Sequence, residues 1–279
     1  MLSSVVFPGA RGSGHLLEVL QMVDINVTVN KLRGREDAES AYCCMMEIPT
    51  PWPEALCMCR DWVTHNLGKY VEGYHLKLPS GEVVGHLYYA PAEQALFPYK
   101  VESGAAVLYC DWVQRSYQGK GLGRRLFTTF IDDMQKQGVK GILVEATDQV
   151  GQMHYQHYTG RGFTTVHELD HSRLLYLPIS QEQIHFQALA PKIHPRHGAP
   201  VEVVVINGYR CPFEVATHLI LQQVIQEFGN QVTFQQAWLT PETLGEYGAS
   251  RGIFINGRRK LYGGEPEAAI RQAIAEELD

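Results

Sequence analysis

Three closely spaced glycines, in Gln118-Gly119-Lys120-Gly121-Leu122-Gly123, lie between an apolar run and a helix-like pattern. A helix N-terminus carries unpaired backbone N–H groups and a partial positive charge, and glycine lets such a backbone approach an anion closely. Lys120 and the following Arg124 and Arg125 add positive charge. The stretch predicts a phosphate or pyrophosphate site, with an ordinary strand-to-helix turn as the alternative.

The spacing of these glycines argues against two nucleotide-binding motifs. A P-loop ends in Gly-Lys-Ser/Thr, whereas Gly123 is followed by two arginines. A dinucleotide-binding fingerprint needs G-x-G-x-x-G, and the glycines at 119, 121 and 123 do not have that spacing. A different phosphate-bearing ligand is therefore expected.

The pattern Gln-x-x-Gly-x-Gly at residues 118–123 resembles the acyl-CoA site of the GNAT N-acetyltransferases. "LYCDWV" at 108–113 is similar to that family's fourth strand, whose end separates from its neighbour and offers backbone groups to pantetheine. The resemblance extends from about residue 25 to 178 and implies acetyl-CoA as co-substrate, a primary amine as acceptor and no metal. The CoA contacts that it implies are Asp111, Trp112, Val113, Gln118, Gly119, Lys120, Gly121, Leu122, Gly123 and Arg124.

A second motif, "HYTGRGF" at 157–163, is similar to the family's Tyr-x-x-x-Gly-Phe, which places Tyr158 where the general acid lies. In acyl transfer a neutral amine attacks the thioester and the leaving thiolate takes a proton, which a tyrosine hydroxyl can supply. Glu145 is the preferred general base, and Asp111 and Glu93 remain alternatives. Each of these side chains could instead be structural.

One position departs from the family pattern. Members often carry an asparagine shortly before the tyrosine, where this chain has Gly151 and Gln152. This departure leaves open a catalytically degenerate, CoA-binding sensor or partner module.

The six cysteines are expected to be thiols, since disulfides are rare in large cytosolic chains. Cys43-Cys44 and Cys57-x-Cys59 are poorer zinc motifs than paired cysteines two to four residues apart. A metal or thiol site near the acceptor is the alternative to small buried residues.

The region after residue 200 resembles a thioredoxin fold, with "VEVVVINGYRCPFEVATHLIL" as its first strand and helix. Cys211 lies at the helix start, where the helix dipole lowers a thiol pKa. Glu214 takes the place of the second cysteine, and Arg251-Gly252 that of the proline that faces the thiol. A structural or docking role is favoured, and a monothiol enzyme using Cys211 is the alternative.

Five stretches occur in the same order as in GNAT proteins with a YoaP-type C-terminal domain, and the chain resembles these proteins. They are "AYCCM", "APAEQALFP", "LYCDWVQRSYQGKGLG", "LLYLP" and "YRCPF".

The elements that must position these residues follow from apolar periodicity and turn signals. Strands are expected at 27–31, 74–78, 83–89, 106–113, 141–146, 162–169, 173–179, 201–206, 232–238, 252–255 and 259–262. Helices are expected at 54–66, from Gly121 up to Gln137, at 152–161, at 213–228, from Thr240-Pro241 and at 265–278. The predicted class is α/β with a mixed sheet: an extension (1–24), a GNAT domain (25–180), a linker (181–200) and a smaller thioredoxin-like domain (201–279).

Composition fits a globular enzyme. The chain has 279 residues, 45% of them hydrophobic, and a net charge of −6, which argues against a general nucleic-acid binder. No run approaches the ~20 apolar residues of a membrane helix, and the N-terminus is a poor signal peptide. A cytoplasmic location is expected, with Met22 as an alternative start and a homodimer left open.

Overall fold

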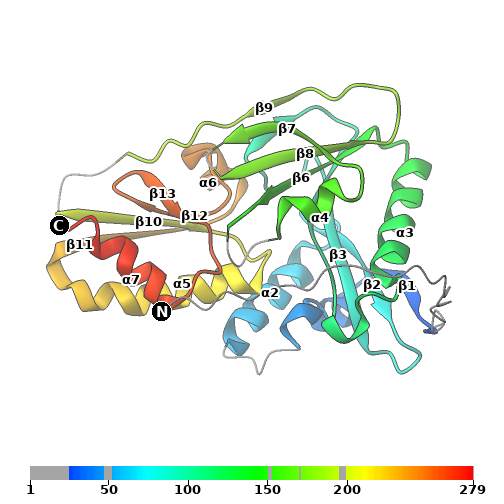
Figure 1. The fold of residues 1–279 in the computed structure, drawn as a ribbon, viewed down its shortest axis with the longest axis horizontal. Coiled ribbons are helices and arrows are strands. Elements are labelled where there is room, and N and C mark those ends of the chain that lie inside the picture. The colour runs from blue at the N-terminus through cyan, green and yellow to red at the C-terminus, as the bar shows by residue number, and fades with distance from the viewer. Residues whose placement is uncertain (1–24, 47–51, 150–152, 170, 195–198, 279) are drawn as a thin grey trace, which may run out of the picture.

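The structure, a computed structural model, describes residues 25–46, 52–149, 153–169, 171–194 and 199–278. These residues form two units, each built on its own sheet (Figure 1). The mixed α/β class expected from the sequence is confirmed, because each of the two larger sheets combines parallel and antiparallel strand pairs. The predictions for residues 1–24, Gly151 and Gln152 concern positions outside the described residues.

The first unit contains a seven-stranded sheet in the order β1-β2-β3-β5-β6-β8-β7. Its strands are β1 (Thr28–Lys31), β2 (Glu72–Lys77), β3 (Val83–Pro91), β5 (Ala105–Val113), β6 (Gly141–Thr147), β7 (Thr164–Leu169) and β8 (Ser172–Pro178). Neighbours are antiparallel except β5 and β6, which are parallel.

The β5–β6 pair separates halfway along its length. The two strands are paired only from Ala105 opposite Gly141 to Leu108 opposite Val144, although both continue beyond these positions. Tyr109 has no partner on β3, where the register shifts. Such an irregularity bends a strand, and an opening in the middle of the sheet results.

Helices cover this sheet. Helix α3 (Leu122–Lys136) buries Leu126, Phe130 and Met134 against the sheet, at the spacing of one helix face. Pro53 occupies the first turn of α2 (Pro53–Asn66), where its missing N–H costs nothing. Two short helices, α1 (Arg35–Glu39) and α4 (Tyr155–Thr159), complete the unit.

The second unit has a four-stranded sheet in the order β11-β10-β12-β13. Its elements are β10 (Val201–Asn207), α5 (Pro212–Phe228), β11 (Val232–Trp238), α6 (Pro241–Tyr247), β12 (Gly252–Ile255), β13 (Arg258–Leu261) and α7 (Glu267–Ala275). The central β10 is buried along its whole length, as a near-continuous valine run predicts. The Thr240 side chain caps α6, as expected from its sequence.

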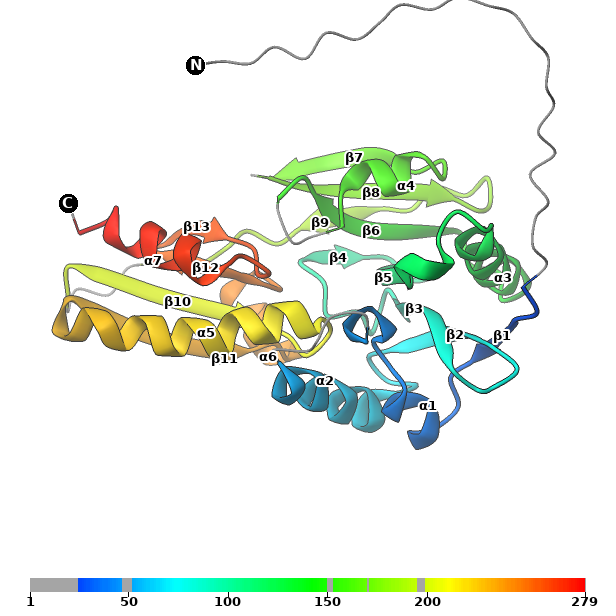
Figure 2. The same cartoon turned by 60° about the horizontal axis from the view of Figure 1, so that its bottom comes forward.

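The two units share part of their core. Val215 and Ala216 of α5 belong to the same buried cluster as Cys59 and Val63 of α2. Helices α2 and α5 lie next to each other in both views (Figures 1 and 2). Burial of apolar side chains holds the two units together. The periodicity of a sequence shows that a helix has an apolar face, but it does not show which other helix that face packs against.

Part of the expected linker 181–200, residues 181–194, contacts both units. It contains β9 (Phe186–Ala188), which pairs with β4 (Tyr99–Val101), and the Lys192 N–H donates to the Tyr247 carbonyl at 2.8 Å. Both strands have only three residues, too few to show a period. No helix in the described part of the chain is long and apolar enough to span a bilayer.

Candidate active site

A cavity of about 820 Å³ occupies the opening between β5 and β6 and continues to the second unit. On the side of the first unit its walls come from both strand ends, from α4 and from the residues around Arg115. On the other side they come from the residues around Cys211 at the start of α5 and from Arg251. The cavity is large enough to hold the reacting ends of two small molecules.

The glycine loop follows the lining residues Arg115 and Ser116 along the chain, and its own residues 118–123 are not part of the cavity wall. Gly119 and Gly121 have φ angles of 73° and 77°, which side chains with a Cβ rarely adopt. Gln118 Nε2 donates to the Val113 carbonyl at 2.8 Å and ties the loop to β5. The loop leads directly into α3, so the first-turn N–H groups of α3 and its dipole point toward the loop.

The basic and the apolar residues of the predicted CoA site differ in their exposure to solvent. Lys120 and Arg124 are exposed, and Lys120 Nζ donates to the Ser116 carbonyl at 2.7 Å. The side chains of Leu122 and Val113 are buried against each other, so their backbone groups are what they can offer a ligand. Gly123 lies in the first turn of α3.

Trp112 and Asp111 face different surroundings. Trp112 lines the cavity, and its Nε1 is buried without a hydrogen-bond partner among the described residues. The Asp111 carboxylate instead accepts hydrogen bonds from His157 Nε2 at 3.1 and 3.2 Å and pairs with Arg161 at 2.5 Å. Burial alone raises the pKa of Asp111, but the His157 hydrogen bond and the Arg161 charge outweigh it, and the pKa is lowered. Asp111 thus fastens α4 to β5.

Tyr158 lies on α4, is 1% exposed and lines the cavity. Burial raises the pKa of its hydroxyl well above the ordinary value, and the charge of Asp111 adds to the effect. The hydroxyl therefore keeps its proton at neutral pH. This is the protonation state that a general acid requires.

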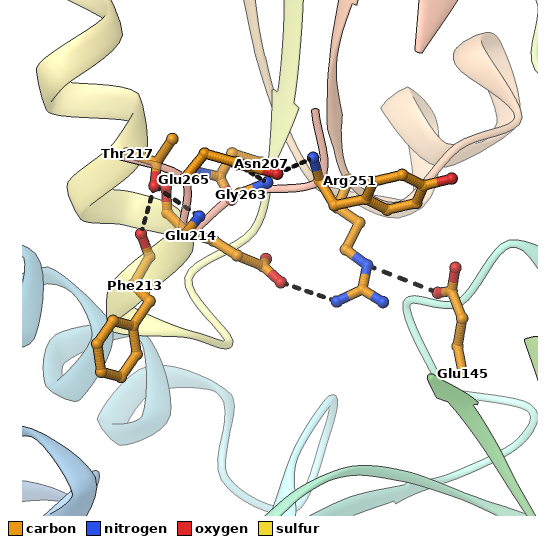
Figure 3. A network of polar contacts seen from close by, with 10 residues as sticks. Glu145, Asn207, Phe213, Glu214, Thr217, Arg251, Gly263 and Glu265 are labelled. Atoms are coloured by element: carbon orange, nitrogen blue, oxygen red, sulfur yellow. Dashed lines mark hydrogen bonds and ion pairs between the residues drawn. The ribbon is translucent and has the colours of Figure 1, made fainter. Parts of the chain in front are cut away.

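Glu145 lies on β6 just beyond the point where the strands separate, and it also lines the cavity. Its Oε2 is 3.9 Å from Arg251 Nε, and Arg251 Nη1 is 3.1 Å from Glu214 Oε1 (Figure 3). Burial by itself raises the pKa of Glu145, but the charges of Arg251 and Arg259 outweigh it and lower the pKa. Glu145 is therefore ionised and fixed by a cation from the other unit.

The three carboxylates that the sequence suggests as general bases have different surroundings in the structure. Glu145 lines the cavity, Asp111 is engaged with α4, and Glu93 is exposed and accepts from the Gly104 N–H at 3.0 Å. Sequence reasoning missed the contribution of the second unit to the same cavity. The available signal was an arginine, Arg251, at the position of the proline that faces the thiol in a thioredoxin fold.

The cysteines divide between the cavity and its surroundings. Cys44, Cys110 and Cys211 line the cavity, whereas Cys57 is exposed on α2. Burial raises the pKa of Cys211 to about 12, opposing the expected effect of the helix start. Among the described residues no three His, Cys, Asp or Glu side chains are grouped so as to hold a metal ion.

Residues 40–163 match the model of the Acetyltransferase (GNAT) family. No protein with a curated description matches the sequence. Similar solved structures include a GNAT-family acetyltransferase of Desulfovibrio desulfuricans, at 16% identity, TM-score 0.45, 56% coverage of this chain and 100% of that one. The ribosomal-protein-S18-alanine N-acetyltransferase of Escherichia coli is 21% identical, with TM-score 0.40 and coverages of 57% and 97%. The PaiA N-acetyltransferase of Thermoplasma acidophilum, in complex with coenzyme A, is 14% identical, with TM-score 0.38 and coverages of 55% and 99%.

Proposed function

We propose, from the GNAT family match of residues 40–163, that this protein is an acyl-CoA-dependent N-acyltransferase. It transfers an acetyl group from acetyl-CoA to the primary amine of a small molecule or peptide by direct attack. The observation that carries the proposal is the cavity between the separated ends of β5 and β6, with Tyr158 in its wall and the glycine loop directly after its lining residue Ser116 in the chain.

The donor is proposed to lie along β5. Its pyrophosphate would be held by the N–H groups of Gly119–Gly123 and by the charges of Lys120 and Arg124. The unpaired edge of β5 beyond Leu108 would offer backbone groups to pantetheine and an N–H to the oxyanion. The acyl group would then project into the cavity.

The reaction needs two proton transfers. As the amine nitrogen attacks the thioester carbon, the C–N bond forms, the C–S bond breaks and the nitrogen loses a proton. We assign acceptance of that proton to Glu145 acting through water, since a carboxylate with a lowered pKa is a weak base. Tyr158 donates its proton to the departing thiolate and regains one from solvent.

The second unit is proposed to be thioredoxin-like and of the YoaP type. Support comes from its element order β-α-β-α-β-β-α and its strand order β11-β10-β12-β13, with β12 antiparallel to β10. We assign to this unit the role of forming one wall of the cavity. A monothiol role for Cys211 is disfavoured because burial raises the pKa of this thiol to about 12. A cytoplasmic location and a homodimer stay predictions, to be checked by fractionation and light scattering.

The test is release of CoA from acetyl-CoA, followed by chromatography, with a panel of primary amines and the full chain. We expect amine-dependent CoA release and an acetylated product of matching mass. CoA binding by calorimetry without turnover of any amine would instead favour the sensor alternative.

A further inference from the structure

One wall of the cavity belongs to the second unit. Seven of the cavity-lining residues come from it: Arg210, Cys211, Pro212, Phe213, Glu214, Arg251 and Gly264. If the donor enters along β5, this wall faces the acceptor. The inference below rests on the proposed function and concerns what these side chains select.

Glu214 lines the cavity, and one of its carboxylate oxygens has no hydrogen-bond partner in the part of the chain that the structure describes. Its side chain is 6% exposed, and its Oε1 is held by Arg251 at 3.1 Å (Figure 3). Its Oε2 is buried and has no hydrogen-bond partner among the described residues. Leaving a buried carboxylate oxygen without a donor is costly, so a ligand N–H is the group that this position lacks.

Arg210 presents the opposite charge. Its guanidinium carbon lies 4.7 Å from the centre of the Tyr109 ring, at the bulge of β5. Its Nε is buried without a hydrogen-bond partner in the described part of the chain, and no ion pair within 4.0 Å joins it to a carboxylate there. Burial raises the pKa of Tyr109, which the charge of Arg210 opposes, and the same charge contributes to the lowered pKa of Glu145. Glu145 and Glu214 both lie nearer to Arg251, so Arg210 can pair with the anion of a ligand. Arginine binds carboxylates in a bidentate manner.

The remaining wall near these two groups is apolar and aromatic. It includes Trp52, Phe97 and Phe213, and the rings of Trp52 and Phe213 meet edge to face with centroids 6.3 Å apart. Aromatic walls with few, separated polar groups are typical of sites that bind small molecules with one apolar end.

We propose that the acceptor is an amino acid with a large apolar side chain, a single molecule carrying both a primary amine and a carboxylate. The Glu214 carboxylate accepts a hydrogen bond from the amine, Arg210 binds the carboxylate, and the aromatic wall contacts the side chain. Recognition of the acceptor's charged groups is thus a property of the second unit, the apolar wall is shared by both units, and activation of the donor is a property of the first.

The test is calorimetric binding to the full chain saturated with CoA, which requires no turnover. The probes are matched pairs with and without the carboxylate: phenylalanine with phenethylamine, and tryptophan with tryptamine. We expect the amino acid of each pair to bind at least about tenfold tighter, the effect of one charge-assisted contact. In Arg210→Met this difference disappears, in Arg210→Lys part of it remains, and in the control Arg258→Met, at an exposed arginine of β13, it is unchanged.

Equal affinities within the pairs, or no binding by any probe, would overturn the inference. The wild-type pairs decide this without any variant, so a poorly folding Arg210→Met does not block the test. Turnover of amines without preference for a carboxylate would reject this inference and leave the proposed acyltransferase standing. Tight amino-acid binding without acetylation would reject the acyltransferase and leave the binding site.

Discussion

Arg251 Nε lies 3.9 Å from Glu145 Oε2, which joins the second unit to the strand end where the first unit opens. Both side chains are nearly buried, at 12% and 10% exposure, and Arg251 is shared with Glu214. A buried cation between two carboxylates holds both in place, and the two units are therefore coupled at the cavity itself.

Replacing Arg251 by glutamine removes the cation that two buried carboxylates share. We expect the free energy of unfolding to fall by about 3–5 kcal/mol, the usual cost of breaking a buried pair. Denaturant titration measures this. Arg258→Gln, at an exposed position, is the control and should change stability by less than about 0.5 kcal/mol. Equal effects of the two variants would contradict the coupling.

The pH dependence of stability should report on the same carboxylate. The pKa of Glu145 is lowered below its ordinary 4.5, so its contribution to stability is present above that value and is lost as the pH falls through the folded-state pKa. In Arg251→Gln this contribution shrinks. Titrations between about pH 6 and pH 3 should show a shallower loss of stability in the variant than in the wild type. Parallel curves would argue against an Arg251–Glu145 interaction.

Removing the Tyr158 hydroxyl tests the proposed acid. Tyr158→Phe should lower kcat by about 100-fold, within the range for general-acid groups, and leave acetyl-CoA affinity unchanged. Tyr155→Phe, on the same α4 helix, is the matched control and should retain activity. Wild-type kcat in Tyr158→Phe would mean that the thiolate takes its proton from another source.

Two glycines in the same backbone conformation at opposite ends of α3 give a matched test of the donor loop. Gly121 has φ 77° and Gly138 has φ 72°, and a Cβ on either meets no described atom within 4 Å. Alanine at each should cost a similar ~1 kcal/mol of stability. Only Gly121→Ala should weaken CoA binding, by about tenfold, because its Cβ intrudes where the anion approaches. Calorimetry showing equal CoA affinities would place the pyrophosphate elsewhere.

The shared core predicts cooperative unfolding. Because α5 packs in one cluster with α2, we expect calorimetry to show one transition for both units. Leu221→Ala, in the core of the second unit, should lower that single transition as a whole, at a cost of about 2–5 kcal/mol. Two separate transitions, only one of them shifted by Leu221→Ala, would contradict this.

The cysteines should differ strongly in reactivity. Cys57 is exposed, whereas burial raises the pKa values of Cys44, Cys59, Cys110 and Cys211. At neutral pH the buried thiols hold their protons, so iodoacetamide should label Cys57 first, as peptide mass spectrometry can measure. Faster labelling of Cys211 would revive the monothiol alternative.

Local sequence patterns were enough to predict most helices and strands, because the apolar residues of long strands and amphipathic helices recur at a regular spacing. Helix α3 and strand β10 are examples. The pairing of β4 with β9 was not predictable, since three-residue strands have no period and are held by partners distant in the chain.

The candidate site also has features that could be predicted from the sequence and features that could not. The glycine loop and the Tyr158 motif are contiguous stretches, and the sequence could point to them. The Asp111 carboxylate forms an ion pair with Arg161, and the Glu145 carboxylate forms one with Arg251. Only tertiary packing brings these residues together. No residue spacing encodes which of several carboxylates meets a cation.

The contacts of residues 186–192 limit how the second unit can move. A flexible linker would allow a domain to move away from the cavity and so to open and close it. Here the β4–β9 pair joins the connection to the first unit, and the Lys192–Tyr247 hydrogen bond joins it to the second. We therefore expect molecules to enter and leave past a wall that stays in place, so turnover would be paced by passage along the cleft rather than by a hinge.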